Sequence, residues 1–352
     1  MYSKEPYVIG ETAYNHEGDI HYLYLMIDDM SEMELNCVKF HLLLDPSSYF
    51  QKKHPLNEGI QKYLFSIDQW KDILDYSGSK GLDVVALCDD VKSIEFINRH
   101  YPGLFAIELH ATCLNDYFLL QEVANFSGKI ILGIGGSTLD EIQYAIDFLY
   151  SHNKKDILLM YGFQSYPTNY QDINLSKMLK LKELFDLEVG YADHTGFDDS
   201  NNISLSCMAA SMGFNVLEKH YTPDYGKERM DYHSAVSKDQ MLQIRKLMKI
   251  SLEVYGSGSI SMSKPELKYG NTGPMKKAIV ASKNILKGEI LSLEHLSFKR
   301  TEEESSIKQN MLFKLIGLEA KVNIEEDEIV DFSKVDYKFK EQRDSDFTNI
   351  EK

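Results

Sequence analysis

Short β-prone runs alternate with helical segments through roughly the first 222 residues, and this alternation most constrains the fold. The eight β-prone runs are 7–11, 37–43, 83–88, 104–109, 129–134, 156–161, 188–194 and 216–222. The helical segments between them include 20–33, 67–80, 114–124, 139–152, 175–185 and 201–212. Such alternation predicts a parallel sheet with right-handed crossovers, and eight units predict an α/β protein built on a (β/α)8 (TIM) barrel. An open doubly wound sheet is the alternative, but no Gly-x-Gly-x-x-Gly follows the first run.

The pattern changes after a helical segment at 241–255. Segments rich in glycine and other turn-forming residues, at 256–259 and 269–274, indicate a linker. The runs beyond it are short and β-like. Segments 284–290 and 323–329 resemble each other, which predicts an internal repeat in a small β domain. We therefore expect a barrel at 1–262, a linker at 263–275, a β-rich domain at 276–337 and a charged, frayed or disordered tail at 338–352.

Two histidines close neighbouring strand runs. His194 ends the seventh run and His220 lies in the eighth. Because neighbouring strand ends of a parallel barrel meet at the face where catalysis occurs, the two imidazoles can share one divalent metal. Either histidine alone is more typical of a hydrogen-bonded residue near a strand end. Together they favour a metal site.

Composition excludes some functions. The chain has 352 residues, 43% apolar content and a net charge of −16, so nucleic-acid or anionic-membrane binding is not expected as its main role. The four cysteines lack the spacing of a zinc site or a disulfide framework. No signal peptide or membrane-spanning run is evident, and we expect a reduced, cytoplasmic protein.

Ordered motifs resemble those of the sialic acid synthases. They read ETAYNHEG (11–18), VKFH (38–41), SYPT (165–168) with DINL (172–175), VGYADHT (189–195), and EKHYT (218–222) with Asp231. The region 277–337 is similar to their C-terminal antifreeze-like (SAF) domain, a small β-rich β-clip fold. Each motif alone is weak, but the ordered set covers nearly the whole chain.

The resemblance implies a reaction and its partners. Sialic acid synthases join phosphoenolpyruvate to an N-acylated amino sugar and form a nine-carbon 3-deoxy-2-keto sugar acid for surface glycans. It also implies a divalent metal, manganese first with magnesium or cobalt as alternatives, held by His194 and His220. Family members form a homodimer in which the SAF domain reaches the partner's barrel.

Site roles follow from the motifs. We expect Glu11, Lys39 and His220 to be catalytic, with Glu11 as a metal-side carboxylate or acid/base and Lys39 as a point charge for a phosphate or carboxylate. The residues expected to bind substrate are Asn15, His41, His110, Gln164, Tyr166, Asp231 and Arg300. Asp231 and Arg300 match family positions that contact the sugar.

Several positions depart from the family pattern. The family's Lys-Ile-x-Ser-x-Glu segment at strand four binds phosphoenolpyruvate, but Ala106 stands at its lysine. Gly133 and Ala192 replace serines at strands five and seven. Losing three charge-assisted bonds weakens binding by roughly a thousandfold or more, so we expect weak or absent binding of phosphoenolpyruvate. His110, Gln164 and the Asp89-Asp90 pair are polar groups at strand ends that can build a pocket for another donor.

Three functions therefore stay open from the sequence. The first is a synthase of the sialic acid type, a transferase that forms a carbon–carbon bond. The second is a metal-dependent aldolase or lyase on the same barrel that does not use phosphoenolpyruvate. The third is a non-catalytic sugar-binding homologue, which the polar replacements at strand ends disfavour.

Overall fold

The computed structural model describes residues 5–165 and 168–338. The chain divides into two compact units, residues 1–258 and 259–352, which are described separately. No helix in the described ranges is both long and apolar enough to span a membrane.

Eight parallel strands form a closed barrel in the first unit, in the order in which they occur in the chain. They are β1 (Tyr7–Glu11), β2 (Cys37–Leu42), β3 (Asp83–Cys88), β4 (Ala106–Leu109), β5 (Lys129–Gly133), β6 (Ile157–Tyr161), β7 (Glu188–Asp193) and β8 (Val216–His220). Each lies within one of the eight β-prone runs, and β1 pairs with both β2 and β8 to close the sheet. The (β/α)8 barrel prediction is confirmed, and the open sheet is excluded.

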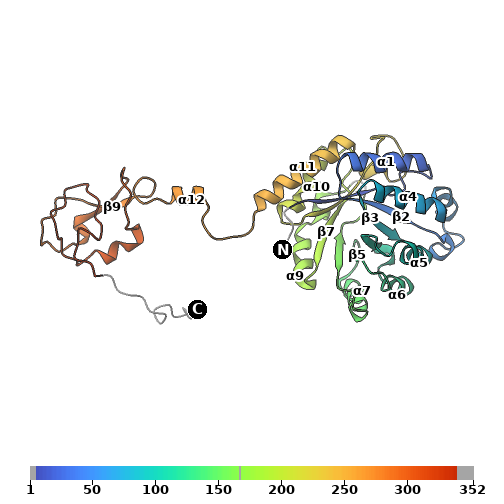
Figure 1. Ribbon diagram of the computed structural model, residues 1–352, viewed down its shortest axis with the longest axis horizontal. Helices are drawn as coiled ribbons and strands as arrows, with labels where there is room; N and C mark the ends of the chain where they lie inside the picture. Colours follow the sequence, from blue (N-terminus) through green and yellow to red (C-terminus); the bar gives the residue numbers. More distant parts are fainter. Residues whose placement is uncertain (1–4, 166–167, 339–352) are drawn as a thin grey trace. The chain divides into compact units, whose positions relative to one another are not determined.

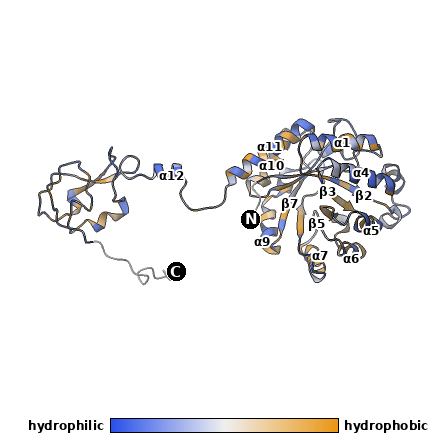
Figure 2. Cartoon of the chain, in the orientation of Figure 1, coloured by the Kyte–Doolittle hydropathy of each residue, from blue (hydrophilic) through white to orange (hydrophobic). Residues whose placement is uncertain are grey.

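A ring of helices surrounds the strands (Figure 1). The main ones are α1 (Ile20–Glu32), α4 (Ile67–Ser79), α5 (Val91–His100), α6 (Tyr117–Val123), α7 (Leu139–Ser151), α9 (Ser176–Phe185), α10 (Asn202–Ser211) and α11 (Lys238–Tyr255). Helices such as α7, α9 and α11 carry both hydrophobic and hydrophilic residues (Figure 2). Their apolar residues form the main core with the outward-facing strand residues, such as Val38, Phe40 and Ile130. This arrangement leaves the inward-facing strand residues to build the site.

Short elements occupy the loops after the strands. The long segment after β2 contains α2 (Pro46–Tyr49), α3 (Asn57–Ile60) and a 3-10 turn, Gln61–Tyr63. A 3-10 turn, Ala111–Cys113, follows β4, helix α8 (Tyr170–Ile173) follows β6, and another 3-10 turn, Tyr232–Ser234, follows β8. A capping box begins α7, because the Thr138 and Glu141 side chains each accept a hydrogen bond from the other residue's backbone amide.

The second unit is small and β-rich. It contains α12 (Lys264–Tyr269), which the sequence did not predict, and an antiparallel pair, β9 (Ala278–Ala281) and β10 (Leu296–Lys299), with 3-10 turns Leu293–His295 and Gln309–Lys314. Other β-like runs form only isolated bridges. The domain boundaries expected at 262 and 275 stay predictions. The disorder expected beyond residue 338 concerns a segment that lies outside the described residues.

The internal repeat in this unit has a structural basis. Ile285 and Ile324 form an antiparallel bridge. Around it, Asn284 Oδ1 accepts from the Glu326 amide and Asn323 Oδ1 accepts from the Lys287 amide, both at 2.8 Å. The repeated asparagines therefore brace each other's turn reciprocally, which explains why the two sequence segments resemble each other.

Candidate functional site

Strand periodicity places the functional side chains in layers inside the barrel. Successive residues of a strand point to opposite faces, so every second residue faces the barrel interior. An apolar layer includes Ile9, Cys37, Val85, Ala106 and Ile131. Two residues further along the strands lies a polar layer with Glu11, Lys39, Glu108 and Glu218. Two residues further toward the carboxyl ends of the strands lie His41, His110, His194 and His220.

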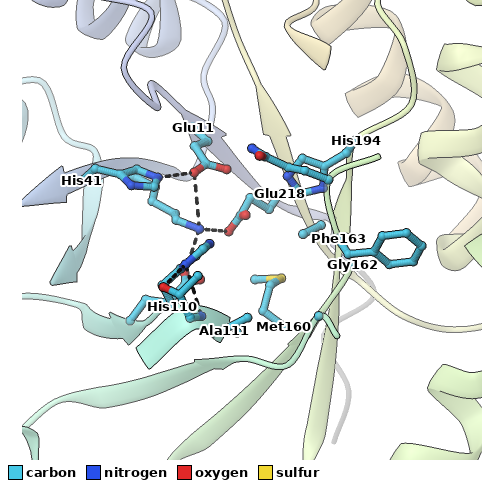
Figure 3. A pocket seen from close by; sticks show the side chains of 16 residues that line it. Glu11, His41, His110, Ala111, Met160, Gly162, Phe163, His194 and Glu218 are labelled. Carbon is cyan, nitrogen blue, oxygen red and sulfur yellow. Dashed lines mark hydrogen bonds and ion pairs between the residues drawn. The ribbon is translucent and has the colours of Figure 1, made fainter. Parts of the chain in front are cut away.

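A cavity of roughly 190 Å³ opens over this polar layer. Figure 3 shows Glu11, His41, Glu218 and His194 pointing toward one another within it. Small residues line the side formed by β5, β6 and β7, namely Gly133, Gly135, Gly162 and Ala192. The cavity therefore has one wall of charged groups and imidazoles, and another where these small residues lie beside Met160, Phe163 and Gln164.

Glu11, His194 and His220 form a potential metal-binding group. One ligand atom from each lies within 4.8 Å of the other two. His220 Nε2 lies 3.1 Å from Glu11 Oε2, and the ring centroids of the two histidines are 5.1 Å apart. Within the described part of the chain, the buried Nδ1 atom of each histidine has no hydrogen-bond partner.

This donor set fits a divalent cation. Burial, and next the charge of His220, lower the pKa of His194 to about 3, so its imidazole is neutral at physiological pH and can act as a ligand. Burial alone raises the pKa of Glu11, but Lys39 and His220 outweigh it and hold the pKa well below its usual range. The site therefore offers two imidazole nitrogens and a carboxylate, which is a common catalytic ligand set.

Lys39 lies among three carboxylates. Its Nζ is 2.8 Å from Glu218 Oε2, 3.0 Å from Glu108 Oε2 and 3.6 Å from Glu11 Oε1. Burial lowers the pKa of Lys39, but the carboxylates, led by Glu108, outweigh burial and raise it above its ordinary value. Burial also raises the pKa of Glu108 and of Glu218. Lys39 is therefore a charged group whose charge is already balanced by the protein.

His41 connects this cluster to Asp89. Its Nε2 lies 2.8 Å from Glu11 Oε1 and its Nδ1 lies 3.9 Å from Asp89 Oδ2. Burial lowers the pKa of His41, but Glu11 outweighs burial and raises it. Burial raises the pKa of Asp89 to about 6. His41 lines the cavity, and its role in binding substrate stays a prediction.

His110 lines the cavity beside Thr112. Its Nδ1 accepts from the Thr112 amide at 3.4 Å and lies 2.8 Å from Thr112 Oγ1. Burial, and then His41, lower the pKa of His110 to about 4. His110 is therefore a neutral imidazole that lines the cavity and can form a hydrogen bond with a ligand.

Other expected substrate-binding residues lie at different distances from the cavity. Gln164 lines it, whereas Asn15 and Asp231 do not. The side-chain amide of Asn15 donates to the Met230 carbonyl at 3.1 Å. The backbone amide of Tyr14 donates to Asp231 Oδ2 at 3.2 Å. Both hydrogen bonds connect the loop after β1 to the loop after β8.

Two further expected residues cannot be placed in the cavity. Tyr166 lies outside the described residues. Arg300 is in the second unit, where its guanidinium donates to the Pro274 carbonyl.

The three positions that depart from the family pattern lie at different depths in the barrel. Gly133 and Ala192 line the cavity, whereas Ala106 lies one layer below it in the apolar interior. Sequence reasoning missed Glu108 and Glu218 as site residues. The two-residue repeat of a strand could have indicated them. Glu108 lies two positions before His110 and Glu218 two positions before His220, so each shares a strand face with a histidine already singled out.

Comparison with known proteins identifies the family. The NeuB family matches residues 26–259, and the SAF domain matches residues 276–336. The chain belongs to the NeuB family. Its barrel and its small β-rich unit agree with the two matches, as the resemblance to sialic acid synthases predicted.

Named relatives of this NeuB family member are sugar-acid synthases. An N,N'-diacetyllegionaminic acid synthase of Campylobacter jejuni is 28% identical, over 93% of this chain and 99% of the relative. The human N-acetylneuraminate-9-phosphate synthase is 23% identical, over 92% and 91% respectively. The solved N-acetylneuraminic acid synthetase of Leptospira borgpetersenii has a TM-score of 0.69 at 22% identity, covering 75% of this chain and 90% of that one, and it supports the fold.

Proposed function

We propose that this chain is a metal-dependent enzyme that forms a carbon–carbon bond at the aldehyde of an N-acylated amino sugar. Its product would be a nine-carbon 3-deoxy-2-keto sugar acid for surface glycan biosynthesis. The observation that carries the proposal is the Glu11, His194 and His220 group, of which Glu11 and His194 line the same cavity as the buried Lys39. The named synthases among its relatives support the sugar-acid product class.

The chain's own residues have distinct roles in this proposal. His194, His220 and Glu11 would hold the metal, manganese first with magnesium or cobalt as alternatives. A divalent ion there supplies a Lewis acid that polarises a carbonyl oxygen. His41, hydrogen-bonded to Glu11, fixes the orientation of that carboxylate, and His110 and Gln164 are positioned to bind substrate oxygens.

Phosphoenolpyruvate is the donor that the sequence resemblance implies, and the transferase reaction would release its phosphate. A second candidate uses the same barrel as a metal-dependent aldolase or lyase with another donor. The observation that favours the second candidate is the pairing of Lys39 with Glu11, Glu108 and Glu218, because these carboxylates already balance its charge.

We also propose that the protein is a homodimer in the cytoplasm. A cytoplasmic homodimer would place Arg300 of one copy near the barrel of the other. Light scattering at micromolar concentration tests the dimer, and a monomer contradicts it.

The experiment combines metal content with turnover. Purified wild type should retain about one divalent ion per chain, and His194→Ala should retain far less. Phosphate release with phosphoenolpyruvate and a panel of N-acylated amino sugars then tests the first donor. Product formation with a non-phosphorylated carbonyl donor supports the second. Equal, negligible metal in wild type and variant contradicts the metal-dependent enzyme.

A further inference from the structure

Two consecutive aspartates follow β3, and they differ in their hydrogen bonds. Asp90 Oδ2 accepts from the Leu44 amide at 2.7 Å and from the Ser93 hydroxyl at 2.6 Å, and its Oδ1 accepts from the Ser93 amide at 3.0 Å. No described residue donates a hydrogen bond to the Asp89 side chain, which forms its ion pair with His41 Nδ1 at the longer distance of 3.9 Å. Asp90 therefore caps helix α5, whereas the Asp89 carboxylate lacks a structural partner of this kind.

The Asp89 carboxylate destabilises the folded protein. The residue is 5% exposed, and burial raises the pKa of its carboxyl group to about 6. A buried charge without hydrogen bonds is unfavourable, and an asparagine of the same shape would carry no such charge. Proteins depart from local rules of stability mainly at functional sites, so this carboxylate indicates a ligand contact.

A ligand can reach Asp89 from the rim of the cavity. Neither of its oxygens is among the fully enclosed side-chain atoms that lack a partner. His41, beside Asp89, lines the cavity, and so does Thr112, whose Oγ1 lies 3.2 Å from the Tyr49 hydroxyl. Burial, and next the charge of Asp89, raise the pKa of Tyr14 and of Tyr49. The carboxylate therefore lies among the aromatic side chains at the cavity rim.

The imidazole of His41 separates Asp89 from the potential metal-binding group. Its Nε2 lies 2.8 Å from Glu11 Oε1 (Figure 3), and Asp89 faces Nδ1 on the other side of the ring. The aldehyde of the sugar is expected at the metal-binding group, so Asp89 faces a part of the sugar further along its chain. An N-acylated amino sugar carries hydrogen-bond donors there, and a carboxylate accepts from both hydroxyl and amide groups.

We propose that Asp89 is a specificity-determining residue that accepts a hydrogen bond from an O–H or N–H group of the acceptor sugar, remote from its aldehyde. The inference rests on the proposed function, because it assigns a residue to the recognition of that sugar. The bound sugar supplies the hydrogen bond that the fold does not supply. Charge-assisted hydrogen bonds are the stronger ones, so a carboxylate at this position discriminates between sugars with and without the donor.

Three sugars test this subsite by calorimetry at pH 7 with manganese present. N-acetylmannosamine carries remote hydroxyls, its 4-acetamido-4,6-dideoxy derivative carries a remote amide N–H, and its 4,6-dideoxy derivative lacks both donors. Wild type should bind one of the first two at least about tenfold more tightly than the third. The tighter of the two identifies the donor as a hydroxyl or an amide.

Asp89→Asn keeps the shape of the side chain and removes its charge. Its affinity for the preferred sugar should fall about tenfold, whereas its affinity for the 4,6-dideoxy derivative should stay within about threefold of wild type. The variant should also unfold at a higher temperature than wild type at pH 7, because the buried charge is gone. An aspartate with a structural role would give the opposite change in unfolding temperature.

Asp90→Asn is the matched control, since it is the same substitution at the next residue. Asp90 accepts three hydrogen bonds as a carboxylate, so this variant should unfold at a lower temperature. Its discrimination among the three sugars should remain that of wild type. The two variants therefore change stability in opposite directions, and loss of sugar discrimination is expected for Asp89→Asn alone.

Three results overturn the proposal. They are a wild type that binds none of the sugars or does not discriminate among them, an Asp89→Asn variant with unchanged discrimination, and an Asp89→Asn variant that is less stable or does not fold. Metal content and turnover are measured separately. A protein that discriminates through Asp89 but shows no turnover contradicts the proposed function and leaves the sugar subsite in place.

Discussion

Asp193 and Lys219, on neighbouring strands, form a buried ion pair with 2.8 Å between Oδ2 and Nζ, and each directly precedes one of the two histidines of the potential metal-binding group. Because alternate strand residues face opposite sides, the pair points outward while His194 and His220 point inward. Ser206 of α10 donates to the same Asp193 oxygen at 2.5 Å. The pair therefore fixes the ends of β7 and β8 to each other and to the helix behind them.

Breaking this pair should destabilise the barrel. Lys219→Met leaves the buried Asp193 carboxylate without its counter-ion, and loss of a buried partner costs about 3–5 kcal/mol. Denaturant unfolding of the barrel measures the loss, and metal affinity should also fall because the histidines lose their common support. Lys180→Met is the control, since Lys180 makes an exposed pair with Glu183 and should change stability by less than about 1 kcal/mol. Equal effects of the two variants would contradict the structural role.

Removing one metal ligand should abolish stoichiometric metal binding. His194→Ala deletes one of the two imidazole ligands, and the expected affinity loss exceeds the about tenfold to a hundredfold that loss of an outer-shell partner costs. Metal analysis after extensive dialysis gives the stoichiometry. His100→Ala, at the exposed end of α5, should retain the wild-type content. Retention of the full metal content by His194→Ala would place the ion elsewhere.

Much of this architecture is local in the sequence and could be predicted. The strand runs and the positions of His194 and His220 follow from periodicity within single segments. The partners of Lys39 could not be predicted in the same way, because Glu108 and Glu218 reach it from β4 and β8 across the barrel interior. That contact depends on the register between strands, which one strand's pattern does not contain. The Arg300 contact with Pro274 likewise depends on how distant turns fold together.

Gly135 permits close contact between the strand ends that line the cavity. A Cβ atom at this position would overlap the carbonyl oxygen of Gly162, which is backbone and cannot rotate away. Gly135→Ala should therefore destabilise the barrel by about 1–3 kcal/mol and distort this side of the cavity. Gly59→Ala is a matched control, because a Cβ there meets no atom within 4 Å in helix α3. Thermal unfolding compares the two, and similar unfolding temperatures would show that the strand ends shift freely.

The buried Asp89 carboxylate should make stability fall as pH rises through mildly acidic values. Burial raises its pKa from 3.8 to about 6, so its contribution is fully present below about pH 4 and is lost as pH rises through 6. Asp89→Asn removes this dependence. The unfolding free energy of the variant minus that of wild type should therefore increase by up to about 3 kcal/mol between pH 4 and pH 7. Asp68→Asn, at an exposed position, is the control for the change from carboxylate to amide. Other groups titrate in both proteins, so their contributions cancel in the difference between the two unfolding free energies. If this difference does not change with pH for Asp89→Asn, the Asp89 carboxylate ionises at an ordinary pH.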